Sequence, residues 1–177
     1  IPTQRKLPWI PDEAEWLALL ATACSEPVRN RLMLAFAYDC ALRREELCSL
    51  ATGDIDPARR HLRVRAETTK TKRERVVPYS MVSADLYMAY LAERRRLFEE
   101  RWAYGGLGFM ASFSDLLLND ESNKTAADFV RAKIREVVKD PKTAEILTPK
   151  NIIGCKRLCV DDGYWDTFNR PNVTLVD

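Results

Sequence analysis

The sequence lacks the features that mark several common classes of protein. The 177 residues include one histidine and six glycines, and no stretch approaches the roughly 18 consecutive apolar residues of a membrane-spanning helix. We expect no signal peptide, and the five cysteines show no regular pairing. We therefore expect reduced thiols, a cytoplasmic location and no contact with a membrane. Cys155 and Cys159 have no further cysteine or histidine nearby, so we expect no metal site.

The sequence also lacks a glycine-rich loop that could cradle a dinucleotide. Such a loop reads G-x-G-x-x-G and follows directly on a strand. The segment Gly105-Gly-Leu-Gly-Phe is the most similar to such a loop, but no apolar strand precedes it. The sequence therefore predicts that the chain alone binds no cofactor.

Positive charge is concentrated in one segment of the chain. The formal net charge is only +2, yet eight lysines and arginines stand against two glutamates between Arg59 and Arg75. Apolar and polar residues alternate from His61 to Ala66, and Arg75 to Pro78 forms a second strand pattern, with Lys70 to Arg73 between them. The pattern predicts a basic β-hairpin, which is either a solvated edge or a surface that binds a polyanion.

A helix is expected just before this hairpin. Leu42, Leu47 and Leu50 recur at helical spacing, so they should face a core, and the turn residues from Gly53 to Pro57 should end the helix. Arg43 stands at the start of this otherwise apolar segment. Two interpretations stay open for it, a functional arginine or an ion pair with Glu46.

The remaining pattern is mainly helical. Asp12 can cap an amphipathic helix to about Ser25, with one apolar face, and Pro27 precedes an apolar helix from Val28 to Tyr38. Further helices are expected at 83–100 and 125–139. The predicted fold class is mainly α with a small β-hairpin, followed by an α+β fragment in the second half. We expect the aromatic residues Trp102, Tyr104, Phe109 and Phe113 to form core rather than a cofactor site.

The helix and hairpin together resemble the first half of the tyrosine recombinase (phage integrase) catalytic domain. That family's first box reads G-L-R-x-x-E-L-x-x-L-x-x-x-D-I, and the segment Ala41-Leu-Arg-Arg-Glu-Glu-Leu-Cys-Ser-Leu-Ala-Thr-Gly-Asp-Ile differs from it by alanine for glycine. The family's hairpin reads G-K-G-x-K-x-R-x-V-P. The segment Thr69-Lys-Thr-Lys-Arg-Glu-Arg-Val-Val-Pro matches it with threonine for both glycines.

The resemblance implies a partner, duplex DNA, and a set of site residues. Arg43 matches the first catalytic arginine and Lys70 the hairpin lysine. Lys72, Arg73 and Arg75 are then candidates for DNA contacts. In the family a tyrosine attacks a DNA phosphodiester, the arginine stabilises the developing charge and the lysine protonates the leaving 5′ oxygen.

The catalytic set that the resemblance implies is incomplete. From about Arg94 the recombinase pattern stops. Leu147-Thr-Pro-Lys-Asn-Ile-Ile-Gly occupies the register of the family's H-x-x-R box, with Lys150 in place of histidine and Ile153 in place of arginine. Tyr164 lies too close to that register to be the nucleophile. We therefore expect a DNA-binding, partial recombinase that does not cleave DNA.

The second half resembles an internal segment of Baeyer–Villiger flavin monooxygenases. Gly154-Cys-Lys-Arg-Leu-Cys-Val-Asp-Asp-Gly-Tyr-Trp-Asp-Thr-Phe-Asn-Arg-Pro-Asn-Val carries the resemblance most specifically. It implies that Lys156 meets the 2′-phosphate of NADPH and that Arg157 faces a peroxyflavin. FAD and NADPH belong to this alternative alone, which is an inactive fragment without its flavin-binding domain.

The sequence thus predicts two partial domains, 1–93 and 94–177, joined within Glu93–Leu97. A chimera, a rearranged gene fragment and an assembly error would each produce such a chain. Three functional hypotheses stay open: a DNA-binding recombinase remnant, a monooxygenase fragment, and a translation product without function.

Overall fold

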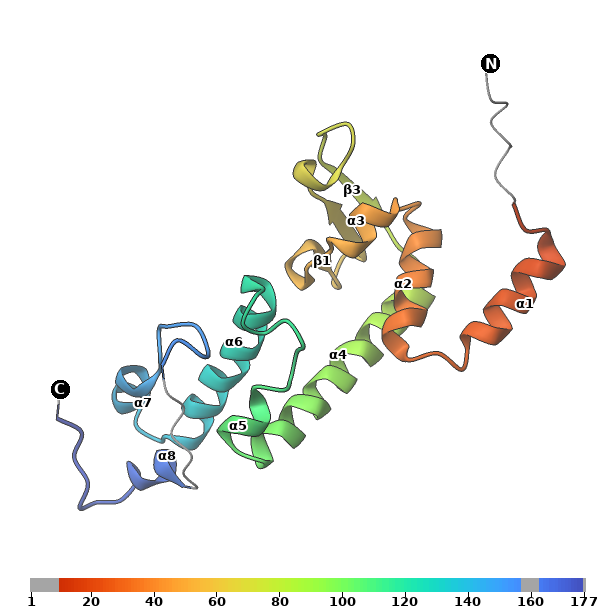
Figure 1. Cartoon of the computed structure of the whole chain (residues 1–177). Coiled ribbons are helices and arrows are strands. Elements are labelled where there is room, and N and C mark those ends of the chain that lie inside the picture. Colours follow the sequence, from red (N-terminus) through yellow and green to blue (C-terminus); the bar gives the residue numbers. More distant parts are fainter. Residues whose placement is uncertain (1–9, 157–162, 177) are drawn as a thin grey trace. The chain divides into compact units, whose positions relative to one another are not determined.

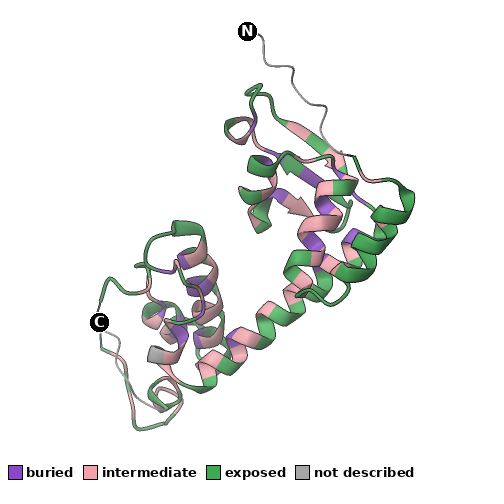
Figure 2. Ribbon diagram, turned by 45° about the vertical axis from the view of Figure 1, so that its right-hand side comes forward, coloured by how far each residue is buried: buried purple, intermediate pink, exposed green. Residues whose placement is uncertain are grey.

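The structure is a computed structural model, which describes residues 10–156 and 163–176 (Figure 1). Helices dominate it, and one small antiparallel sheet accompanies them, which confirms the predicted mainly helical fold with a β-hairpin. The chain packs as two compact units, residues 1–91 and residues 92–177. Each unit has buried residues of its own, whose stretches of ribbon are purple in Figure 2.

The sheet of the first unit contains the predicted hairpin. Strands β2 (His61–Val64) and β3 (Arg75–Pro78) pair antiparallel, and the short strand β1 (Ile55–Asp56) pairs with the other edge of β2. Leu62 and Val64 are buried while His61 and Arg63 are exposed. This alternation is the period of two that the sequence shows, since successive side chains of a strand point to opposite faces.

Four helices accompany the sheet, and three of them lie close to the predicted ranges. They are α1 (Glu13–Ala23), α2 (Val28–Asp39), α3 (Arg44–Cys48) and the first part of α4 (Met81–Ala103). Short 3-10 turns occupy Thr52–Asp54 and Ala66–Thr68. The main core of the unit joins α2, the sheet and α4, through Leu32, Phe36, Cys40, Leu62, Val64, Tyr79 and Tyr87.

Helix α1 begins as the sequence predicts but buries less than its apolar face suggests. Asp12 accepts a hydrogen bond from the Glu15 backbone N at 2.8 Å, and the Glu15 carboxylate accepts one from the Asp12 backbone N at 2.9 Å. This reciprocal pair is a capping box. No residue of α1 is buried, and its main ring contact is the stacking of Trp16 on Tyr38, with 5.1 Å between ring centroids.

Helix α3 is shorter than the leucine spacing predicts. Leu42 and Leu50 lie outside it, although both pack with Leu47 against the core. Ala41 lies between α2 and α3 and interrupts the helical conformation there, because its backbone φ is 47°, in the left-handed region. That conformation is strained for a residue with a Cβ and unstrained for glycine, which accounts physically for the glycine of the integrase box at this position.

We expect Ala41→Gly to raise the free energy of unfolding by about 1 kcal/mol, because glycine removes the left-handed strain. Urea denaturation followed by circular dichroism measures this change. Ala51→Gly is the matched control, since Ala51 has an extended backbone with φ −102°. Glycine there should destabilise by about 0.5–1 kcal/mol through the entropy of the unfolded chain. Equal effects of the two changes would contradict the explanation.

The regular elements described in residues 92–177 are all helices. They are the second part of α4, then α5 (Gly106–Phe109), α6 (Asp120–Val137), α7 (Pro141–Leu147) and α8 (Tyr164–Thr167). Helix α6 covers the predicted helix at 125–139 and starts earlier, because Asn119 caps it by accepting hydrogen bonds from the backbone N of Glu121 and Ser122.

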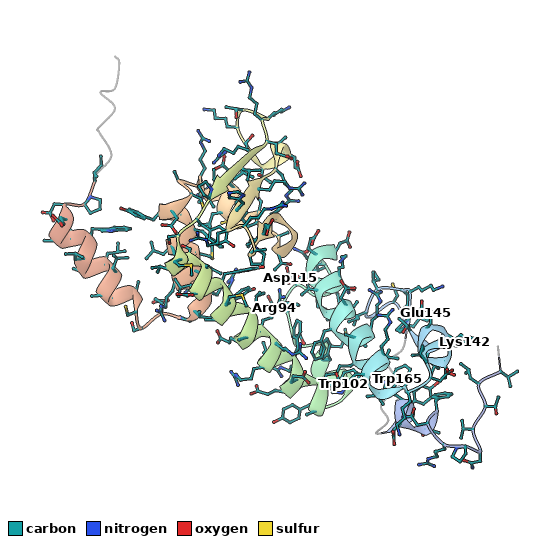
Figure 3. All side chains as sticks on the ribbon, turned by 180° about the vertical axis from the view of Figure 1, so that it is seen from behind. Arg94, Trp102, Asp115, Lys142, Glu145 and Trp165 are labelled. Carbon is teal, nitrogen blue, oxygen red and sulfur yellow. The ribbon has the colours of Figure 1, made fainter. Side chains whose placement is uncertain are left out.

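Aromatic rings form the main core of the second unit. Phe98 of α4 is buried, and its ring contacts those of Phe109, Phe113 and Phe129 at centroid distances of 5.5, 5.6 and 5.2 Å. Trp102, labelled in Figure 3, adds an edge contact to Phe129. The predicted aromatic core is therefore confirmed for these rings, whereas Tyr104 is exposed.

A second, smaller core lies between α6, α7 and α8. Ile134, Val138 and Ala144 are buried there, and Trp165 of α8 packs against them (Figure 3). The side chain of Asn169 fixes the end of α6, because it donates to the Val137 carbonyl at 2.8 Å and accepts from the Lys139 backbone N at 2.9 Å.

Candidate nucleic-acid interface

Arg43 and Arg75 meet at one buried carboxylate, that of Glu46. Arg43 is the residue that precedes α3, and Glu46 lies in the first turn of that helix. Nη1 and Nη2 of Arg75 donate to the two carboxylate oxygens at 2.9 and 2.7 Å. Arg43 donates through its backbone N at 2.9 Å and through Nη1 at 3.2 Å. The ion pair that the sequence suggested for Arg43 is therefore present, and its side chain stays 60% exposed. A functional role of Arg43 stays a prediction.

These donors keep Glu46 ionised. The hydrogen bonds from Arg75 lower the pKa of Glu46, burial opposes them, and the bonds from Arg43 add to the decrease, which leaves the pKa at about 2 instead of the ordinary 4.5. The same contact with Glu46 raises the pKa of Arg75. At neutral pH the three groups therefore form a charged cluster that joins α3 to strand β3.

A second buried carboxylate, that of Asp54, joins the turn that follows α3 to strand β2 and the residue after it. Asp54 accepts from the Ala51 backbone N at 3.0 Å. It also pairs with Arg63 at 3.4 Å and with Arg65 at 3.2 Å, and Arg65 Nη2 donates to the Ser49 carbonyl. Both acidic residues of the integrase box thus hold the hairpin through arginines.

The tip of the hairpin carries cations without partners. Lys70, Lys72 and Arg73 are exposed, and in the described ranges 10–156 and 163–176 their side chains make no ion pair or hydrogen bond. Buried Thr69 shapes the turn: its hydroxyl accepts from the Arg73 backbone N at 3.1 Å, and its carbonyl accepts from the Lys72 backbone N at 3.2 Å. The tip therefore presents free positive charge on a fixed backbone.

The predicted site residues fall into two groups. Arg43 and Arg75 share Glu46, whereas Lys70, Lys72 and Arg73 lie together at the tip. Sequence reasoning gave Glu46 only as a possible partner of Arg43 and gave Asp54 only a role in ending the helix. The strand register was the signal that could have shown that Arg75 needs a buried partner. Arg75 lies opposite buried Val64, and paired residues of an antiparallel sheet point to the same face.

The segment in the position of the H-x-x-R box, residues 147–154, lies in the second unit. Among the described residues its side chains form no catalytic arrangement. Lys150 is exposed. Ile153 packs against the aromatic core, and its backbone N donates to the Asn123 side chain at 3.0 Å. Lys156, the predicted NADPH contact, is exposed, and Arg157 lies outside the described residues.

Two kinds of site are absent from the described part of the chain. No helix there is long and apolar enough to cross a membrane, and no group of three or more histidine, cysteine or acidic side chains is arranged to hold a metal ion. Cys40 is buried, and this burial raises the pKa of its thiol to about 11, so the thiol stays protonated at neutral pH.

Comparison with known proteins places the chain in a family. Residues 11–141 match the model of the phage integrase family. The chain therefore belongs to the phage integrase family. The match extends beyond residue 93, where the sequence pattern predicted the integrase part to end.

The chain is also similar to flavin monooxygenases. It is 51% identical over 88 residues to a 2-oxo-Δ3-4,5,5-trimethylcyclopentenylacetyl-CoA monooxygenase of Pseudomonas putida. This alignment covers 49% of this chain and 16% of that protein. It is 46% identical over 88 residues to a Baeyer-Villiger monooxygenase of Pseudooceanicola batsensis, with 48% and 16% covered. The chain thus spans about one sixth of the length of these curated relatives.

One solved structure in the same class is an oxidized steroid monooxygenase bound to NADP. The identity is 52%, the match covers 49% of this chain and 17% of that one, and the TM-score is 0.46. The family match and the curated relatives confirm both resemblances that the sequence motifs indicate. The integrase match and the monooxygenase matches overlap in the chain, because together they are longer than its 177 residues.

Proposed function

We propose that this integrase-family chain binds duplex DNA as a partial tyrosine recombinase. The observation that carries the proposal is the hairpin tip, where Lys70, Lys72 and Arg73 are exposed and free of partners within the described residues. Fixed, unpaired cations next to a well-anchored strand suit the phosphate backbone, which dominates the affinity of non-specific DNA binding.

Two residues of the proposed surface have catalytic roles in the family. Arg43 would stabilise charge on a phosphate, and Lys70 would donate a proton to a leaving oxygen. The 177 residues contain one histidine, His61, and it lies in strand β2. No H-x-x-R box accompanies Arg43 and Lys70 in this sequence, so we expect binding without strand cleavage by this chain alone, since groups that act as a unit are not additive.

The expected affinity for a mixed-sequence duplex is about 10⁻⁴ to 10⁻⁶ M at physiological salt, and it should fall as salt rises. Changing Lys70, Lys72 and Arg73 together to alanine should reduce the slope of log K against log salt by about 3, because each phosphate contact contributes about 1. Gel shift or fluorescence anisotropy at several salt concentrations measures the slope.

The matched control removes three exposed lysines of the second unit, Lys139, Lys142 and Lys150. Lys142 lies on α7 and is labelled in Figure 3. This variant makes the same change in net charge, so its salt slope should equal that of the wild type. An unchanged slope in the hairpin variant would show that the tip does not contact DNA.

A second candidate function is that of a monooxygenase segment, which the 51% identity to one relative favours. Lys156 and Arg157 would then serve NADPH and a flavin in a longer protein that supplies the nucleotide-binding domains. Incubation with FAD, followed by gel filtration and an absorbance spectrum, separates the two candidates. Retained stoichiometric flavin would favour the monooxygenase candidate.

A further inference from the structure

Arg75 points toward the protein interior rather than toward solvent. It pairs with buried Val64 across the hairpin, so its side chain leaves the sheet on the face that Val64 buries. Only 33% of the side chain is exposed. Both of its terminal nitrogens donate to Glu46, at 2.9 and 2.7 Å, in the two-pronged geometry that suits a guanidinium and a carboxylate.

The four hydrogen bonds to Glu46 use all the acceptor sites of its carboxylate. An ionised carboxylate offers about four lone-pair positions, and Arg75 and Arg43 each fill two of them. Arg43 donates to Glu46 only through its backbone N and Nη1. Its Nε and Nη2 make no hydrogen bond with any described residue, and its side chain is 60% exposed.

We infer that Arg75 is a positioning residue, which occupies Glu46 and thereby keeps the outer edge of the Arg43 guanidinium free for a phosphate. This assignment rests on the proposed DNA-binding function, and it gives Arg75 a role other than the direct DNA contact that the sequence suggested. Without Arg75, a fully buried carboxylate would face a single cation. Glu46 would then take two nitrogens of Arg43, since a buried charge is costly unless fully paired.

Phenylglyoxal, which attacks accessible guanidinium groups, tests this inference without DNA. In the full chain, Arg75→Gln should lower the modification rate of Arg43 about tenfold, because a second charge-assisted hydrogen bond holds the guanidinium. Peptide mass spectrometry gives the rate at each arginine. Exposed Arg29 serves as the internal reference. Arg73→Gln is the matched control, since Arg73 lies on the same hairpin and its side chain has no partner among the described residues. It should leave the rate at Arg43 unchanged.

The direction of the change separates positioning from simple loss of structure. A hairpin that detached from α3 would expose Arg43 and raise its rate. Arg75→Lys decides that case, because lysine keeps the positive charge and the fold but cannot engage both carboxylate oxygens. It should also lower the rate at Arg43. Any result other than a decrease in the lysine variant overturns the inference.

DNA binding provides the second measurement. Arg75→Gln and Arg43→Ala should each weaken binding of a duplex, and the double variant should bind no more weakly than Arg43→Ala alone, because one residue acts through the other. Additive losses would overturn the inference and indicate a separate contact for Arg75. Absence of salt-dependent binding in the wild type would refute the proposed function, whereas a slower modification of Arg43 would still establish the positioning.

Discussion

Glu46→Ala is expected to lower the free energy of unfolding of residues 1–91 by about 3 kcal/mol. The change removes the buried carboxylate to which both Arg43 and Arg75 donate, and it leaves the mostly buried side chain of Arg75 without its partner. It also removes the cap on the Arg43 backbone N. Urea denaturation monitored by circular dichroism should show the transition of this unit at a lower midpoint.

Glu45→Ala is the matched control, one residue away on the same helix. Glu45 pairs with Arg44, and the two side chains are 71% and 86% exposed, so water screens the pair and its loss should leave the denaturation midpoint nearly unchanged. A large loss for Glu45→Ala, or a negligible one for Glu46→Ala, would mean that the carboxylate cluster does not hold α3 to the hairpin.

Lowering the pH should destabilise the wild type, as Glu46→Ala does, because it removes the charge of Glu46. The pKa of Glu46 is lowered to about 2 in the folded chain from an ordinary 4.5. Its contribution to stability is therefore fully present above pH 4.5 and decreases as the pH falls toward 2, where the folded carboxylate takes up its proton. In Glu46→Ala this part of the acid dependence should be absent, which a pH series of denaturation midpoints can measure.

Phe98→Ala is expected to unfold residues 92–177 selectively, at a cost of about 4 kcal/mol. Phe98 is buried and its ring contacts three other phenylalanine rings, and truncation of a core phenylalanine removes both its apolar surface and its packing. The core of residues 1–91 contains none of these rings. The variant should therefore keep the salt-dependent DNA binding of the wild type while it loses helical circular dichroism.

Tyr104→Ala is the control for this prediction, because Tyr104 is an aromatic residue of the same unit that is 81% exposed. It should leave both stability and binding unchanged. Loss of DNA binding together with the helical signal in Phe98→Ala would indicate that the binding surface depends on the second unit.

Local patterns in the sequence predicted much of the fold. The alternation around Leu62 and Val64 gave strand β2 and its buried face, and Asp12 as a cap gave the start of α1. These features depend on neighbours within a few residues. The exposed cations at the hairpin tip were predicted for the same reason, since a turn between two strands is solvated.

The features that sequence reasoning missed depend on contacts between distant residues or on backbone conformation. Glu46 and Arg75 are 29 residues apart, and neither position alone shows that the other fills its hydrogen bonds. The left-handed backbone of Ala41 shortened α3, although alanine is a strong helix former. The apolar face of α1 predicted burial that its residues do not show, because amphipathic spacing says nothing about whether a partner surface is present.

Helix α4 belongs to both cores, and this has a consequence for how such a chain tolerates change over evolutionary time. Leu91 is its last residue packed on the first core, and Phe98 is the first residue buried in the second. Between them, Arg95 and Arg96 are exposed and pair one turn ahead with Glu99 and Glu100. Such positions need helix propensity more than any particular side chain. Two unrelated coding sequences could therefore have been joined there without harm to either core, provided that the helix continued across the junction.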